Sequence, residues 1–233
     1  EKEKNRIPEG WAFSLPTESQ WEYACRAGTR TAYSWGNEID SSRANYNWEN
    51  RQDSTQSCDV GQYAANPWGF YDMHGNVWEW CADWYAKYPS GVLTNPIGPA
   101  TGTVRVKRGG SCHDNRVSLL SHVRGYYAPD AHWPNMGFRI VFQSTLPSLT
   151  GSDGKSRNQG RSDNNEKSES NGDLKDLADA SKKSSQQEKT FIAKSAKNLE
   201  MIWCPPGSYL RGDGYNTNTV ILTEGFYLGK YEV

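Results

Sequence analysis

The sequence predicts a loop-rich α+β fold with little regular secondary structure. One stretch, PTESQWEYACRAG (16–28), carries the signals of a short helix at both ends. A few short stretches in which apolar and polar residues alternate indicate strands, and long runs of turn-forming residues lie between them. Residues 1–143 are also rich in Trp, Tyr and Gly, and such aromatic residues can supply a core or line a ligand cleft.

The expected helix begins after Thr17. Thr17 is a suitable N-cap, and Gln20, three residues later, completes a capping-box pattern. Trp21, Ala24 and Cys25 fall on one helical face, and Gly28 is expected to end the helix. We therefore expect a short helix that packs through this apolar face.

The strands are expected on either side of long loops. Residues 34–56, SWGNEIDSSRANYNWENRQDSTQ, show little periodicity and many turn residues. Alternating apolar residues in TVRVKRGGS (103–111) and GFRIVFQ (137–143) each predict a strand. Near the end, ILTEGFYLGKYEV (221–233) is expected to form a pair of strands.

Residues 144–197 are predicted to be a disordered, low-complexity linker. Between residues 144 and 190 there is no aromatic residue, and charges of both signs are interleaved. Such a composition cannot bury enough apolar surface to offset the entropy lost on ordering.

Charge and cysteine content exclude several classes of function. A net charge of −1 gives no reason to expect a nucleic-acid partner. No apolar run approaches the ~20 residues of a membrane span, and the charged start EKEKNRIPEG does not indicate a signal peptide. The five cysteines are too irregularly spaced for a disulfide scaffold, and no CxxC pair indicates a structural zinc site.

Several motifs together resemble the formylglycine-generating enzyme (sulfatase-modifying factor) family. They are LPTESQWEYACRAGT (15–29), NPWGFYDMHGNVWEWCADWY (66–85), RVKRGGS (105–111), APDAHWPNMGFRIV (128–141), MIWCPPGSYLRG (201–212) and GFYLGKYEV (225–233). The resemblance implies a complex, loop-rich α+β fold that is C-type lectin-like. It points to the branch that lacks the catalytic cysteine pair.

The order of these motifs differs from that of the family, in which the PPG and GKYEV strands precede the LPTE helix. We therefore interpret residues 1–143 as the C-terminal part of one domain copy and 198–233 as the opening strands of a second, truncated copy. A circular permutation is the alternative. It is disfavoured because the segment that normally joins GKYEV to the LPTE helix is absent.

The motif YDMHGNVWEW (71–80) is expected to hold a structural calcium ion. Two carboxylates with carbonyls between them suit a hard cation that takes six to eight oxygen ligands. The resemblance implies that the ligands are the side chains of Asp72 and Glu79 and the carbonyls of Gly75 and Val77. A second family calcium site would use Asn45 and Tyr46.

Cys112 is the candidate for a catalytic thiol, together with Ser111. Oxidase members of the family bind copper(I) through two thiols after GGS, and soft thiolate pairs select that ion. No second cysteine follows Cys112 before the end of the first domain part. Copper is therefore not expected, and we predict that Cys112 is not catalytic.

A ligand cleft is expected beneath GGS, because oxidase relatives bind an extended peptide there. Aromatic residues mixed with hydrogen-bonding groups suit a recognition surface. The candidates are His113, Asn115, Arg124, Tyr126, Tyr127, His132 and Trp133.

We therefore predict a non-catalytic, calcium-stabilised module that binds a protein, peptide or small molecule, with neighbouring domains in the same protein. The alternative is a copper-dependent oxidase that converts a sulfatase cysteine to formylglycine, or a related metal-dependent oxidoreductase. An iron-dependent sulfoxide synthase would need a histidine-rich partner domain, which this sequence does not contain. The resemblance favours a periplasmic or extracellular location.

Overall fold

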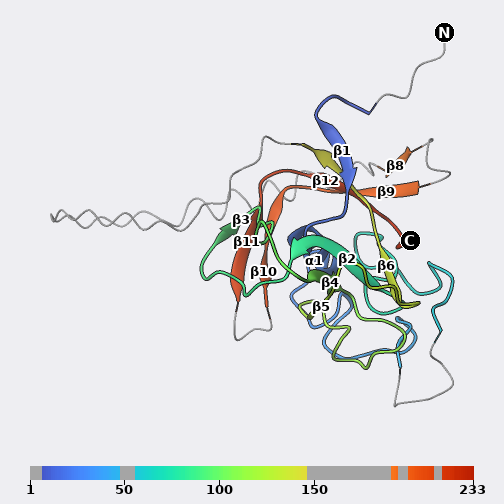
Figure 1. Cartoon of the computed structure of the whole chain (residues 1–233). Coiled ribbons are helices and arrows are strands. Elements are labelled where there is room, and N and C mark those ends of the chain that lie inside the picture. The colour runs from blue at the N-terminus through green and yellow to red at the C-terminus, as the bar shows by residue number, and fades with distance from the viewer. Residues whose placement is uncertain (1–6, 48–55, 146–189, 194–198, 213–216) are drawn as a thin grey trace, which may run out of the picture.

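The computed structural model describes residues 7–47, 56–145, 190–193, 199–212 and 217–233. These residues form one helix, α1 (Glu18–Arg26), and twelve strands in three small sheets (Figure 1). The strands are β1 (Trp11–Ser14), β2 (Trp78–Trp84), β3 (Leu93–Thr94), β4 (Arg105–Arg108), β5 (Arg124–Tyr127), β6 (Met136–Phe138), β7 (Val141–Ser144), β8 (Thr190–Ala193), β9 (Leu199–Cys204), β10 (Gly207–Arg211), β11 (Asn218–Leu222) and β12 (Phe226–Gly229). In this part of the chain, the single helix is too short and too polar to cross a membrane. The loop-rich α+β prediction is confirmed.

The largest sheet joins the two ends of the chain. Its strand order is β1-β7-β12-β9-β8, so the late strand β12 lies between β7 and β9. β12 is antiparallel to both neighbours, with Leu228 opposite Val141 on one side and Ile202 on the other. A four-stranded sheet, β5-β4-β2-β6, and a three-stranded sheet, β10-β11-β3, complete the fold.

The helix forms where its capping signals predict. Thr17 Oγ1 accepts a hydrogen bond from Gln20 N at 3.2 Å, and Gln20 Oε1 accepts one from Thr17 N at 2.9 Å. The helix ends one residue before the predicted stop, because Ala27 takes the left-handed conformation with a φ of 45°. All nine helical residues are buried, so α1 lies inside the molecule and contacts β2, β4 and β10 (Figure 1).

Two predictions about strands were wrong: that 137–143 form one strand, and that the strands in 221–233 pair with each other. GFRIVFQ is not one strand but two, β6 and β7, which belong to different sheets. The chain breaks between them because Arg139 is drawn into the interior, where it is fully buried. The expected strand pair in 221–233 is also split, since β11 pairs with β10 and β3 whereas β12 pairs with β7 and β9.

The main core draws residues from both parts of the sequence. Trp21, Phe70 and Val141 from the first part pack in one cluster with Phe226 and Leu228. The proposal that residues 198–233 begin a second copy stays a prediction. In this structure they share a sheet and a core with residues 7–145.

Part of the predicted linker is ordered. Ser144 ends β7, and Thr190–Ala193 form β8 at the edge of β9, whereas the disordered linker as a whole stays a prediction. The stretch TFIA is aromatic and β-branched, which suits a strand. The rest of the predicted linker, 146–189 and 194–197, lies outside the described residues.

A second, smaller core cluster surrounds the buried His74. The ring of Trp35 lies edge-on to His74 with 4.8 Å between their centroids, and Tyr33 stacks on Trp35 at 5.1 Å. His74 Nδ1 lies 2.8 Å from the carbonyl of Leu119, so it donates there, and Nε2 accepts from Ser34 N at 3.1 Å. Burial lowers the pKa of His74 to about 4, and His74 is therefore neutral at pH 7.

We expect His74 to make stability fall in mild acid. Its folded pKa of about 4 is below the ordinary value of 6.5, so the unfolded chain binds the proton first as pH falls. The contribution of His74 is complete above pH 6.5 and declines towards pH 4 by about 2 to 3 kcal/mol. The measurement is urea unfolding at pH 7 and pH 4.5. The difference in free energy of unfolding between wild type and His74→Gln should be smaller at pH 4.5 by this amount.

Wild type must be compared with His74→Gln, because other buried groups make the folded state more stable as pH falls. Burial raises the pKa of Asp83 to about 7 and that of Glu232 to about 8, so both favour the folded state as pH falls. His132→Gln, which replaces an exposed histidine, is the matched control. An advantage of wild type over His74→Gln that is equal at both pH values would contradict the neutral, buried state of His74.

Candidate functional site: a calcium-motif cluster and an aromatic sheet face

One predicted calcium ligand, Glu79, is the partner of a buried arginine. Glu79 Oε1 and Oε2 accept hydrogen bonds from Arg139 Nη2 and Nε, each at 2.6 Å. Trp21 Nε1 donates a third bond to Glu79 Oε2, also at 2.6 Å. Arg139 is held further by the carbonyls of Tyr71, Gly229 and Lys230. Both oxygens of Glu79 are therefore occupied within the protein.

Two further acids lie near Arg139. Asp72 has a left-handed φ of 56°, and its Oδ2 accepts from Gly61 N at 2.7 Å. Burial raises the pKa of Asp72. Glu232 Oε2 is buried without a hydrogen bond, 3.6 Å from Arg139 Nη2. Burial raises the pKa of Glu232 to about 8, with Glu79 and Asp72 adding to the rise and Arg139 opposing it.

These residues form what we call the acid cluster: Asp72, Glu79, Glu232 and Arg139. Three carboxyl groups against one guanidinium suit a hard cation, and Asp72 Oδ1 has no hydrogen bond to any described residue. The oxygens of Glu79 do not suit a cation, because both already accept hydrogen bonds within the protein. Within the described ranges, no three His, Cys, Asp or Glu side chains are arranged to hold a metal ion. The residues thus fit calcium only in part, and ligation by Asp72, Glu79 and the Gly75 and Val77 carbonyls stays a prediction.

The second predicted calcium pair lies against the same turn. Asn45 O accepts from Asn76 N at 2.8 Å, and Asn45 Nδ2 donates to Asn76 Oδ1 at 3.1 Å. A Cβ at Gly75 would lie 2.2 Å from Asn45 O, and Gly75 has a φ of 94°, so only glycine fits here. Tyr46 packs in the smaller core cluster. Close packing of the two chain segments therefore explains Gly75 without a metal.

Cys112 is placed as a core residue. It is only 1% exposed, its N donates to Asn76 O at 2.9 Å, and burial raises the pKa of its thiol. Cys58, which the sequence reasoning did not single out, lies on the other side of Asn76, with its N 2.9 Å from Asn76 Oδ1. Both are free thiols, and burial raises the pKa of Cys58 as well. A protonated thiol is a poor nucleophile and a poor ligand for copper(I).

Ser111 is also buried and is fixed by its neighbours. Its Oγ donates to Asp114 Oδ2 and accepts from Asn135 Nδ2 at 2.9 Å. Asp114 Oδ2 accepts a further bond from Trp78 Nε1 at 2.8 Å. Ser111 therefore positions the loop after β4 and anchors Trp78 through Asp114.

The predicted ligand residues are brought together only in part. Tyr127 in β5 and Trp133 before β6 meet edge to face, with 6.1 Å between ring centroids, and they are 41% and 53% exposed. They belong to what we call the aromatic face: the outer side of the β5-β4-β2-β6 sheet, with Trp78, Trp80, Lys107, Tyr127, Trp133 and Phe138. The strand register places Trp80, Lys107 and Phe138 on this side, since directly paired residues share a face.

Arg124 does not belong to this face. It lies on the opposite side of β5, where its Nη2 donates to Glu18 Oε2 at 2.6 Å and its guanidinium covers the ring of Tyr88 at 4.0 Å. Tyr126 is on that side too, beside Tyr85 at 4.5 Å, although more than half of it is exposed. The prediction that Arg124 lines the cleft stays a prediction, although the buried acid Glu18 holds Arg124 on the side of β5 opposite to Tyr127. His113, Asn115 and His132 are exposed.

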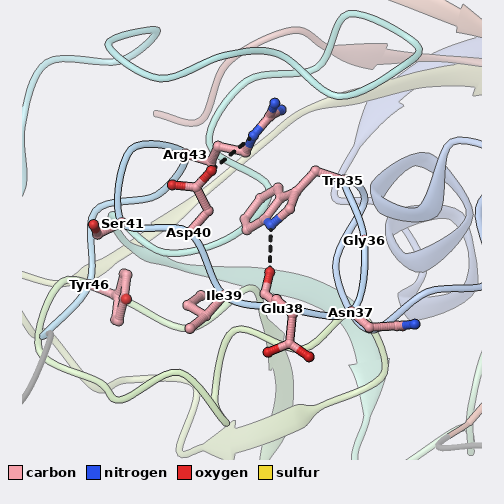
Figure 2. A pocket seen from close by; sticks show the side chains of 9 residues that line it. All are labelled: Trp35, Gly36, Asn37, Glu38, Ile39, Asp40, Ser41, Arg43 and Tyr46. Carbon is pink, nitrogen blue, oxygen red and sulfur yellow. Dashed lines mark hydrogen bonds and ion pairs between the residues drawn. The ribbon is translucent and has the colours of Figure 1, made fainter.

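A separate hollow of about 670 Å³ lies in the loop between residues 35 and 46 (Figure 2). Sequence reasoning did not find it. Its polar groups are paired only in part. Trp35 Nε1 donates to the backbone carbonyl of Glu38 at 3.0 Å, and Arg43 pairs with Asp40 at 3.4 Å, whereas the exposed carboxylate of Glu38 has no partner among the described residues.

Comparison with known proteins agrees with the fold and motifs. A family model described as "Sulfatase-modifying factor enzyme 1-like domain" matches residues 3–144. The chain is 37% identical over 158 residues to a formylglycine-generating enzyme of Streptomyces coelicolor, covering 59% of this chain and 49% of that protein. The chain thus spans about half the length of this relative.

Other relatives carry different names. An inactive C-alpha-formylglycine-generating enzyme 2 of Mus musculus is 31% identical over 148 residues, covering 57% of this chain and 44% of that one. A serine/threonine-protein kinase pkn1 of Chlamydia caviae is 41% identical over 132 residues, covering 54% of this chain and 20% of the kinase. Among solved structures, Treponema denticola variable protein 1 matches with a TM-score of 0.51 and 32% identity, over 58% of this chain and 49% of that one. The chain therefore belongs to the family of sulfatase-modifying factor enzyme 1-like domains.

Proposed function

We propose that this chain is a non-catalytic, ligand-binding member of its family. The observation that carries the proposal is a contrast in exposure around the GGS motif. The thiol of Cys112 is buried, whereas the nearby rings of Tyr127 and Trp133 are about half exposed. Exposed aromatic rings supply contact area at low entropic cost, which suits recognition. A relative named as inactive shows that the family includes members without activity.

The partner is proposed to be a protein or peptide, and the module is proposed to act beside other domains. The Chlamydia caviae kinase matches over only one fifth of its length, so in that protein the domain is one part of a larger chain. The test is binding of peptides to the whole chain. Wild type should retain peptides that a Tyr127→Ala/Trp133→Ala variant does not, since that variant removes the exposed rings.

We expect Cys112 to have no catalytic role. Supplied with copper(I), oxygen and a cysteine-containing sulfatase-type peptide, the chain should form no aldehyde detectable by mass spectrometry. Cys112→Ser should leave peptide binding within about threefold, which corresponds to under roughly 0.7 kcal/mol. Cys58→Ser is the matched control, because Cys58 flanks Asn76 from the other side. Aldehyde formed by wild type and lost in Cys112→Ser would restore the oxidase alternative.

We also propose that calcium stabilises the fold at the acid cluster. The support is the excess of carboxyl groups over the single guanidinium of Arg139 and the unbonded oxygen of Asp72. Calcium at a hundredfold excess over Kd should raise the stability by about 2.7 kcal/mol, seen as a higher melting temperature.

Asp72→Asn should abolish this shift, whereas Asp130→Asn, at an exposed position, should keep it. Glu79→Gln is unsuitable as a test because it also disturbs Arg139. A melting temperature that does not respond to calcium or to a chelator would remove the site.

A further inference from the structure

Lys107 lies across the aromatic face in a space kept open by a glycine. It belongs to β4, and its register partner in β5 is Gly125. A Cβ at Gly125 would lie 2.8 Å from Lys107 Cε and 3.3 Å from the ring of Trp78. The absence of a side chain at Gly125 therefore lets the lysine stem lie flat over β5, against Trp78.

This packing places a cation over the buried ring of Trp78 and near the exposed ring of Tyr127. Lys107 Nζ lies 4.2 Å from the ring centroid of Trp78 and 5.7 Å from that of Tyr127. A cation over an aromatic face gains electrostatic stabilisation from the ring. Trp78 itself is fixed by the hydrogen bond from its Nε1 to Asp114. The ammonium is therefore held in one place rather than left to move freely in solvent.

The same ammonium has no acceptor within the described part of the chain. No hydrogen bond or ion pair joins Lys107 Nζ to any residue there, in contrast to Lys230 Nζ, which pairs with Glu200 at 2.8 Å. The nearest acid, Asp114, already accepts from Trp78 and Ser111 through Oδ2. Partial burial lowers the pKa of Lys107, and the charge of Asp114 opposes this effect. A partly desolvated ammonium without an acceptor favours an external anionic group.

The surroundings favour one carboxylate on an extended peptide. A nucleic-acid backbone would need several clustered cations, whereas the other cation near this face, Arg105, covers Trp84 at 3.6 Å and donates to the carbonyl of Ala82. β5 is an edge strand and pairs only with β4 among the described strands, so an extended chain can lie along it. The exposed rings of Tyr127 and Trp133 can then pack against an apolar neighbour of the acid.

We propose that Lys107, Trp78, Tyr127 and Trp133 form a binding site for an acidic peptide, in which Lys107 pairs with an Asp or Glu carboxylate and the exposed rings pack on the adjoining side chain. This inference rests on the proposed function as a binding module and adds the class of its ligand. Lys107 sets the preference for an acidic residue, and the two exposed rings set the preference for an apolar or aromatic residue beside it.

The test uses a random heptapeptide phage library selected on the whole chain. Peptides enriched on wild type should contain Asp or Glu beside an aromatic or apolar residue. One enriched peptide and its Glu→Gln or Asp→Asn counterpart are then labelled with fluorescein, and their Kd values are measured by fluorescence polarisation. Wild type should bind the acidic form about tenfold more tightly than the neutral form.

Matched variants separate charge from packing. Lys107→Gln should lose this preference while binding the neutral peptide within about twofold of wild type, and Lys107→Arg should retain the preference. Lys87→Gln, at an exposed lysine, should behave as wild type. Equal melting temperatures of Lys107→Gln and wild type would show that the fold is intact.

The failures are distinguishable. If no peptide is enriched on wild type over the Tyr127→Ala/Trp133→Ala variant, the proposed peptide-binding function fails, and the acidic site fails with it. If peptides are enriched but show no acidic preference, or if Lys107→Gln keeps that preference, the acidic site alone is overturned.

Discussion

Replacing Arg139 by methionine is expected to lower the free energy of unfolding by about 3 to 5 kcal/mol. Arg139 is fully buried and gives two hydrogen bonds to Glu79, and it also binds the carbonyls of Gly229 and Tyr71. Removing Arg139 leaves the carboxylate of Glu79 buried, with Trp21 as its one remaining donor among the residues that the structure describes. The measurement is urea unfolding at pH 7, followed by circular dichroism.

The control is Arg30→Met, which changes an exposed arginine and should shift the stability by less than about 0.5 kcal/mol. A double variant, Arg139→Met/Glu79→Leu, should be less destabilised than the sum of its single variants, because the carboxylate of Glu79 is then no longer left buried without Arg139. If Arg139→Met lowers the free energy of unfolding by less than about 1 kcal/mol, the pair of Arg139 and Glu79 does not hold the strands together.

Replacing Phe226 by alanine is expected to cost about 3 to 5 kcal/mol and to destabilise the whole molecule in one transition. Phe226 is 1% exposed and packs in the same cluster as Trp21 and Phe70, which lie far earlier in the sequence. Tryptophan fluorescence and far-ultraviolet circular dichroism should report the same lowered midpoint, since both parts share this core.

This experiment also tests the domain division predicted from the motif order. If residues 198–233 formed an independent unit, Phe226→Ala would leave the unfolding of residues 7–145 unchanged, and two transitions would separate. Phe13→Ala, at a partly exposed position in β1, should cost less than half as much and serves as the control.

Local signals in the sequence predict the local parts of the fold. The capping box at Thr17 and Gln20 forms because it needs only residues three apart. Val106 is buried as its alternation predicts. Cys112 is buried, and its predicted lack of a catalytic role stays a prediction.

Long-range charge pairing explains most of what the sequence could not predict. Glu79 and Arg139 are 60 positions apart, and nothing in their local periodicity marks them as partners. The same holds for two other pairs at α1, Glu18 with Arg124 and Glu22 with Arg108, in which both acids are buried. The local sequence around an acidic residue does not distinguish a metal ligand from the partner of a buried arginine. Glu232 and Cys58 were missed because only the folded chain brings them to the turn at Asn76.

The position of β12 between β7 and β9 has a consequence during synthesis. At about 5–20 residues per second, the roughly eighty residues that separate Ser144 from Phe226 take about 4 to 16 s to leave the ribosome. Throughout that interval β7 has no β12 to cover its inner edge, and an uncovered strand edge is a template for pairing with other chains. Nascent chains are therefore expected to depend on chaperones at this stage, and stalling translation before Phe226 should increase co-aggregation on polysomes.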